Sequence, residues 1–98
     1  MPLAFEWDAN KARENARKHG VTFEEALTIF YDELVATMVD SRHSADEDRY
    51  ISIGTSVRQR LLVVVHTERG DRTRILSSRP ATALERRQYE EGSSEDKR

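Results

Sequence analysis

The sequence predicts an α+β fold with two N-terminal helices, a four-stranded antiparallel sheet and a C-terminal helix. Helix caps and helical spacing of apolar residues mark the stretches before residue 33 and after residue 80. Between them, apolar residues recur with a period of two, which is typical of strands. The strands follow one another with short connections, and this favours an antiparallel meander.

Two helices are expected before the sheet. The first, in "WDANKARENARKHG", has Asp8 as its N-cap and Gly20 just after the last turn, where a left-handed residue is usual. The second, in "VTFEEALTIFYD", begins with Thr22 and Glu25, the two residues of a capping box. Its apolar face is formed by Phe23, Ala26, Leu27 and Phe30.

Four strands are expected at residues 34–40, 49–55, 60–68 and 72–79. The third is apolar on both faces, as a central strand would be. A polar loop at residues 41–48, a hairpin loop at 54–59 and a tight turn at Gly70 connect them. A period of two places Arg74 and Arg79 on opposite faces of the last strand.

A third helix is expected in "ATALERRQYEEG", after the sheet. Thr82 and Glu85 form its capping box, Leu84 is the expected inward anchor, and Gly92 is a plausible end. We therefore expect one domain at residues 1–92 and a disordered tail at residues 93–98.

Charge is distributed unevenly along this chain of net charge −2. Residues 1–57 hold six basic and eleven acidic side chains, a net charge of −5. Residues 58–89 hold eight arginines and three carboxylates, a net charge of +5. Arginine binds phosphate bidentately, so this block predicts a phosphate-binding surface despite the acidic total.

Several classes of site are excluded. The chain has no cysteine, so it has neither disulfides nor a thiolate metal site. His19, His43 and His66 are far apart and match no metal-binding motif, so no metal or other cofactor is expected. No apolar run reaches the roughly 18 residues of a membrane span, and no signal peptide is recognisable, so we expect a cytoplasmic protein with no membrane partner.

The last hairpin holds the candidate chemistry. His66 lies opposite about Arg74 if the turn has two residues, so that an imidazole and a guanidinium could meet. Such a pair suits metal-independent RNA cleavage, in which a base takes the ribose 2′-OH proton, arginines neutralise the transition state and an acid protonates the leaving 5′-oxygen. His66 is then base or acid, Arg74 and Arg79 hold one phosphate, and Tyr89 stacks on a base or donates a proton.

Each candidate also has a structural interpretation. His66 could be packed or solvated, Glu85 could serve only the capping box, and Tyr89 could be an aromatic residue at the edge of the core. Arg79 precedes Pro80 at a strand end that leads into a helix N-terminus, a favourable place for an anion. The alternative partner for its guanidinium is Glu85 or an acid of the first helix.

Several stretches together resemble the BrnT family of type II toxins: "FEWDANKARENARKHGVTFEEALTIFYD", "SRHSADEDRYISIG", "LLVVVHTERGDRTRILSSRPAT" and "ERRQYEEG". The resemblance runs from about Phe5 to Gly92. It implies a RelE-like fold and a ribosome-independent ribonuclease that arrests growth. It also implies neutralisation by a ribbon-helix-helix (BrnA-like) antitoxin, through which alone the toxin would reach operator DNA.

By position, the resemblance assigns the site to the hairpin after His66, to Arg74 and Arg79, and to Glu85 and Tyr89. Part of the acidic half at residues 1–57 would contact the antitoxin, the alternative being a solvated acidic face. The competing hypothesis is a non-catalytic module, a partner or co-repressor whose arginines dock an acidic protein or DNA. Further RNA contacts are expected from Arg58, Arg60, Arg69, Arg72 and Arg86.

Overall fold

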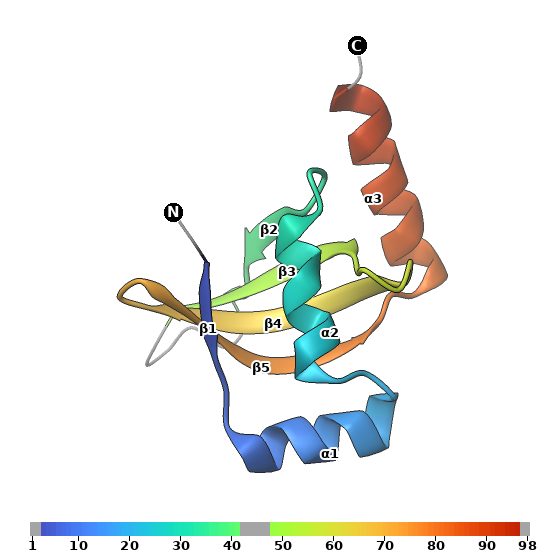
Figure 1. Cartoon of the computed structure of the whole chain (residues 1–98). Helices are drawn as coiled ribbons and strands as arrows, with labels where there is room; N and C mark the ends of the chain where they lie inside the picture. The colour runs from blue at the N-terminus through green and yellow to red at the C-terminus, as the bar shows by residue number, and fades with distance from the viewer. Residues whose placement is uncertain (1–2, 42–47, 97–98) are drawn as a thin grey trace.

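The computed structural model describes residues 3–41 and 48–96. Most of the expected polar loop, residues 42–47, lies outside the described residues. The elements follow in the order β1 (Ala4–Glu6), α1 (Ala9–His19), α2 (Phe23–Leu27), the 3₁₀ helix η1 (Thr28–Tyr31), β2 (Ala36–Val39), β3 (Arg49–Thr55), β4 (Leu61–Arg69), β5 (Arg72–Pro80) and α3 (Ala83–Asp96) (Figure 1).

The sheet has five strands in the order β1-β5-β4-β3-β2. The strands β2 to β5 form the expected antiparallel meander. β1 pairs in parallel with β5, with Ala4 opposite Arg72 and Glu6 opposite Arg74. The expected four-stranded antiparallel sheet is therefore wrong by one strand, because a three-residue strand is too short to show a period of two.

Helix caps form at the start of the chain largely as expected. The Asp8 carboxylate accepts hydrogen bonds from the backbone N–H groups of Asn10 and Lys11, and Gly20 ends α1 with a φ of 68°. Thr22 caps α2 through the Glu25 N–H, at 3.0 Å. The helical stretch then tightens into η1 rather than continuing as one α-helix.

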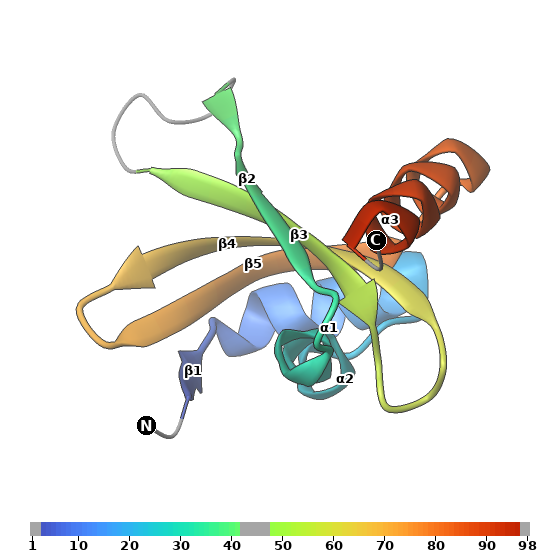
Figure 2. The ribbon, with the colours of Figure 1, turned by 90° about the horizontal axis from the view of Figure 1, so that it is seen from above.

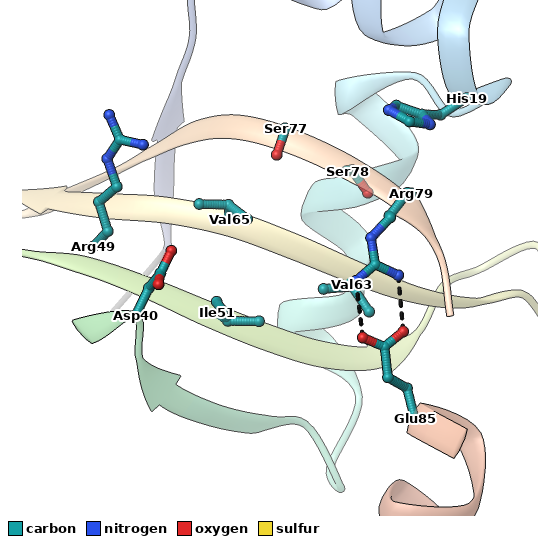
Figure 3. Close-up of a pocket in the computed structure, with 10 residues that line it drawn as sticks. All are labelled: His19, Asp40, Arg49, Ile51, Val63, Val65, Ser77, Ser78, Arg79 and Glu85. Atoms are coloured by element: carbon teal, nitrogen blue, oxygen red, sulfur yellow. Dashed lines mark hydrogen bonds and ion pairs between the residues drawn. The ribbon is translucent and has the colours of Figure 1, made fainter. Parts of the chain in front are cut away.

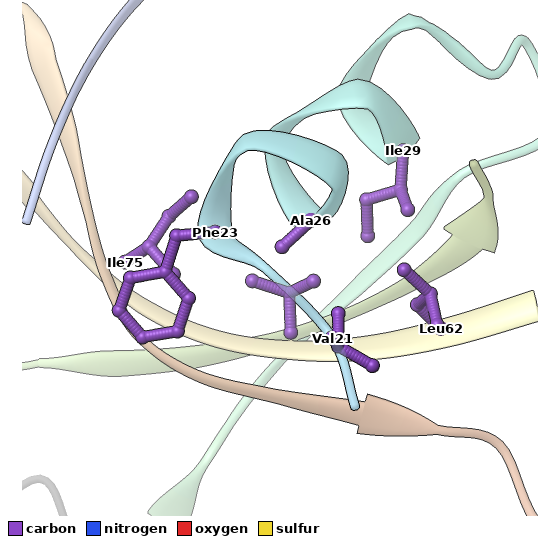
Figure 4. Close-up of a cluster of buried hydrophobic side chains, with 7 residues drawn as sticks. Val21, Phe23, Ala26, Ile29, Leu62 and Ile75 are labelled. Carbon is purple, nitrogen blue, oxygen red and sulfur yellow. The ribbon is translucent and has the colours of Figure 1, made fainter. Parts of the chain in front are cut away.

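The helices lie on both faces of the sheet. α1 and α2 cover one face, here called the α1 face, and α3 stands against the other, the α3 face (Figure 2). The main core lies on the α1 face and is completely buried (Figure 4). It consists of Val21, Phe23, Ala26, Ile29, Leu62, Val64 and Ile75.

A β-bulge interrupts the pairing of β4 with β5. Val65 lies opposite Ser77 but His66 lies opposite Ile75, so β5 has one extra residue there. Arg74 and Arg79 are consequently opposite Thr67 and Val63, which share a face of β4. The strict period of two was wrong in placing these arginines on opposite faces, since both lie on the α3 face.

The last helix, α3, packs on the α3 face through Tyr89 and not through the expected Leu84. Tyr89 contacts a small cluster of Ile53, Leu61 and Val63, whereas Leu84 is 59% exposed and is not the inward anchor. The helix also passes Gly92 and ends at Asp96, so the expected end at Gly92 is wrong. Residues 93–96 of the expected tail are helical, and 97–98 lie outside the described residues.

None of the helices within residues 3–41 and 48–96 is long and apolar enough to cross a membrane.

Gly54 allows β3 to approach η1 closely. A Cβ at this position would lie 3.1 Å from both the Cβ and the carbonyl oxygen of Ile29. Gly54→Ala is expected to lower the free energy of unfolding by about 1–3 kcal/mol, measured by denaturant titration, because η1 must move off the strand. Gly92→Ala meets nothing within 4 Å and serves as the control; its stability is expected to be unchanged or slightly higher. Equal stability of both variants would contradict this packing.

Candidate functional site

A cavity of about 550 Å³, here called the polar cavity, opens on the α3 face (Figure 3). Its floor is formed by Ile51, Val63 and Val65 of the two central strands. Polar side chains from five parts of the chain surround this apolar floor. They include His19, Asp40, Arg49, Ser77, Arg79 and Glu85.

Arg79 and Glu85 form a bidentate ion pair at one end of the polar cavity. Both guanidinium-to-carboxylate distances, Nη1 to Oε1 and Nη2 to Oε2, are 2.8 Å. Arg79 lowers the pKa of Glu85 to about 2, so this carboxylate is ionised at neutral pH. The side chains are 42% and 27% exposed, which leaves the pair accessible from the cavity.

The joint between β5 and α3 positions this ion pair. Pro80 ends the strand, and the Thr82 N–H donates to Glu85 Oε1 at 2.8 Å, while the Glu85 N–H donates to the Thr82 hydroxyl at 3.2 Å. The expected capping box is confirmed. Glu85 therefore serves the helix cap and Arg79 at once, and the structural alternative for Arg79, a salt bridge to Glu85, is present. The Nε–H of the Arg79 guanidinium has no acceptor among the described residues, so this donor can bind a ligand.

His19 lines the same cavity, although no pattern in the sequence indicated it as a site residue. In Figure 3, Arg79 lies between His19, at the end of α1, and Glu85, at the start of α3. The buried Asn15 explains this placement: its amide donates to the Ser78 carbonyl at 2.8 Å and accepts from the Ser78 N–H at 3.0 Å. Asn15 thus fastens α1 to β5 next to Arg79, a contact that spacing in sequence could not reveal.

Arg74 does not share a site with Arg79. It forms a 3.0 Å ion pair with Glu6 of β1 and lies five residues from Arg79, roughly 15 Å along the strand. The expected convergence of both guanidinium groups on one anion-sized spot is wrong. Arg49 is the arginine that lines the polar cavity together with Arg79.

The other arginines expected to bind RNA lie outside the polar cavity. Arg60 donates through Nε to Glu25 at 2.9 Å, which explains why the Glu25 carboxylate does not complete the capping box at Thr22. The Arg58 guanidinium lies 4.0 Å from Glu25, and that of Arg86 lies 3.9 Å from Glu90. Arg69 and Arg72 are exposed at the β4–β5 turn.

His66 lies on the α1 face, opposite the polar cavity, and is 3% exposed. Its Nε2 is 2.8 Å from Ser52 Oγ and its Nδ1 is 2.9 Å from Glu68 Oε2, while its ring packs against Phe30 and Tyr50. The expected meeting of His66 with Arg74 is therefore wrong, because the bulge pairs His66 with Ile75. In this position the packed interpretation of His66 holds.

Tyr89 is held at the edge of the core. Its hydroxyl donates to Asp32 Oδ2 at 2.5 Å, and the same oxygen accepts from the Thr55 N–H at 2.8 Å. Its ring borders a second cavity of about 200 Å³, here called the apolar cavity, which shares Ile51, Val63 and Glu85 with the polar cavity. Tyr89 therefore presents its ring rather than its hydroxyl to the α3 face.

Within the described part of the chain, no group of three or more His, Asp or Glu residues is placed to hold a metal ion.

A family model described as "Ribonuclease toxin, BrnT, of type II toxin-antitoxin system" matches residues 7–85. The structure is similar to the crystal structure of the Brucella abortus ribonuclease toxin, BrnT, with a TM-score of 0.60 and 21% sequence identity. The match covers 83% of this chain and 99% of that chain, and at this identity it shows a shared fold. No curated protein sequence matches the chain.

The buried position of His66 predicts a pH-dependent stability. Burial lowers its pKa below the usual 6.5, so the folded protein binds fewer protons there than the unfolded chain. His66 therefore does not reduce the free energy of unfolding above pH 6.5. The free energy of unfolding falls as the pH drops through that value toward the lower pKa of the folded state. We expect the melting temperature to fall between pH 7.5 and 5.5, and to fall less in His66→Gln. An unchanged slope in His66→Gln would contradict this assignment.

Proposed function

The chain belongs to the BrnT family of ribonuclease toxins of type II toxin-antitoxin systems, and we propose that it cleaves RNA in the polar cavity. The family implies an RNA substrate and an antitoxin partner. The observation that supports this location is the Arg79–Glu85 ion pair, which is accessible from the polar cavity. His19 lines the same cavity. One carboxylate, one guanidinium and one imidazole are the groups that metal-independent RNA cleavage needs.

In the proposed reaction, Glu85 is the general base. It accepts the proton of the ribose 2′-OH, whose oxygen then attacks the adjacent phosphorus atom. Arg79 stabilises the negative charge that develops on the phosphate oxygens. His19 donates a proton to the leaving 5′-oxygen, so the products are a 2′,3′-cyclic phosphate and a 5′-hydroxyl. The three groups supply base, charge stabilisation and acid without a metal ion.

The ion pair tunes the base in this proposal. With a pKa of about 2, Glu85 is in the correct ionised form but is a weak base. A phosphate bound to Arg79 competes for the guanidinium and brings a second negative charge near the carboxylate. Both effects raise the pKa of Glu85 in the complex, which strengthens it as a base where the substrate lies.

Other residues take supporting roles in this proposal. Arg49, which was not expected from the sequence but lines the polar cavity, and Arg74, on the same face, would contact neighbouring phosphates of the RNA. His66 is proposed to stabilise the α1 face rather than to transfer protons.

The family resemblance also suggests the fold type, the antitoxin and the biological effect. We propose a RelE-like fold, a ribbon-helix-helix antitoxin that alone links the toxin to operator DNA, and growth arrest in the cytoplasm. The acidic half of the chain supports a basic antitoxin partner, because opposite charges favour association.

Substitutions at the three proposed groups test the site directly. Arg79→Ala and Glu85→Gln are each expected to reduce the cleavage rate of an RNA oligonucleotide by about 10²–10³-fold. His19→Ala should also reduce it, while Arg13→Ala, at an exposed arginine that lines neither cavity, should match the parent. Melting temperatures should change little, since a partly exposed ion pair contributes about 1 kcal/mol or less. Parent-like cleavage by Arg79→Ala would place the chemistry elsewhere.

Removal of divalent ions tests the metal-independent mechanism. Cleavage in EDTA is expected to continue and to leave 2′,3′-cyclic phosphate ends, measured by mass spectrometry of the fragments. Loss of cleavage in EDTA that Mg²⁺ restores would contradict the mechanism. Absence of cleavage in either buffer, together with a tight antitoxin complex, would instead favour the non-catalytic binding module.

A further inference from the structure

The polar and apolar cavities share a wall, formed by Ile51, Val63 and Glu85. From this juxtaposition we infer that the apolar cavity is a nucleobase subsite, in which Gln88 reads the edge of the base. The inference rests on the proposed function, because it takes the phosphate of the same RNA to lie at Arg79.

The lining of the apolar cavity suits the faces of a base. Its walls are Met38 of β2, Ile51 and Ile53 of β3, Val63 of β4 and the ring of Tyr89 from α3. Met38 is 55% exposed, so a ligand that covers it removes apolar surface from water. Stacking on aromatic and apolar side chains is the usual way in which a protein holds an unpaired base.

The polar groups of the apolar cavity are few and come from α3. The Tyr89 hydroxyl is engaged by Asp32, and Glu85 is paired with Arg79. Gln88, which is exposed on α3, is therefore the lining side chain placed to bond a base edge. Its amide has both donors and an acceptor, which matches the mixed edge of a nucleobase.

Continuity with the polar cavity favours a base over an apolar peptide side chain. Glu85 lines both cavities, so one nucleotide can place its phosphate beside Arg79 and its base beside Tyr89. A nucleotide combines a charged phosphate with a flat base whose faces are apolar, and adjoining polar and apolar cavities suit these two parts. An apolar side chain of the antitoxin would use the walls but leave Gln88 and the adjoining charges without a role.

Calorimetric titration of the full chain with the four nucleoside 3′-monophosphates and with inorganic phosphate tests the subsite. At least one nucleotide is expected to bind about tenfold or more tightly than phosphate, because base stacking adds affinity. Ala36→Phe, at an exposed residue of β2 that lines the apolar cavity, should fill it and remove this gain. Gln88→Ala should keep most of the gain but reduce the differences among the four bases. Glu91→Ala, on an exposed part of α3 outside both cavities, is the matched control and should behave as the parent.

Two results would overturn the subsite. Nucleotides that bind the parent no more tightly than phosphate, or a base-dependent gain that survives Ala36→Phe, would show that no base occupies the cavity. Loss of antitoxin binding by Ala36→Phe with unchanged nucleotide affinities would assign the cavity to the antitoxin. The titration does not depend on cleavage, so failure of the proposed ribonuclease reaction would be recognised separately, by the rate measurements on Arg79→Ala.

Discussion

The ion pair between Arg79 and Glu85 connects the sheet to the C-terminal helix and lies beside both cavities of the α3 face. It joins the last residues of β5 to the first turn of α3, and Glu85 also caps that helix. One helical turn later, Tyr89 packs on the sheet and bonds Asp32. The two contacts hold α3 upright at one end of the sheet. Figure 2 shows the helix at this end of the sheet, and Glu85 in its first turn lines both cavities.

The two faces of the sheet differ in how they are packed. On the α1 face, hydrogen-bonding side chains connect four strands, from Thr37 through Ser52, His66 and Glu68 to Thr73. Its two buried members, Ser52 and His66, are both hydrogen-bonded within this chain of side chains, as is usual for buried polar groups. The apolar core of the same face is closed to solvent. The α3 face has the smaller apolar cluster and the partly exposed Arg79–Glu85 pair. A ligand can therefore reach this face without disturbing the main core.

Local signals predicted much of the fold, because caps, turns and apolar periods depend on residues close in sequence. Asp8, Gly20 and Thr82 act at the helix ends where they were expected. The bulge at His66 and the pairing of β1 could not be predicted, since both depend on contacts between distant strands. The site was predicted in part for the same reason. Arg79 and Glu85 are neighbours in sequence and meet. His19 lines the same cavity because the Asn15–Ser78 hydrogen bonds join α1 to β5, a contact between residues far apart in sequence.

We propose that an RNA phosphate binds at Arg79, in the polar cavity that Glu85 and His19 also line. A crystal structure with a dinucleotide that lacks the 2′-hydroxyl, and so cannot be cleaved, tests it most directly. We expect a phosphate oxygen within hydrogen-bond distance of the Arg79 guanidinium and the base against Tyr89. A phosphate bound at Arg74 or on the α1 face, with the Arg79–Glu85 pair untouched, would contradict it.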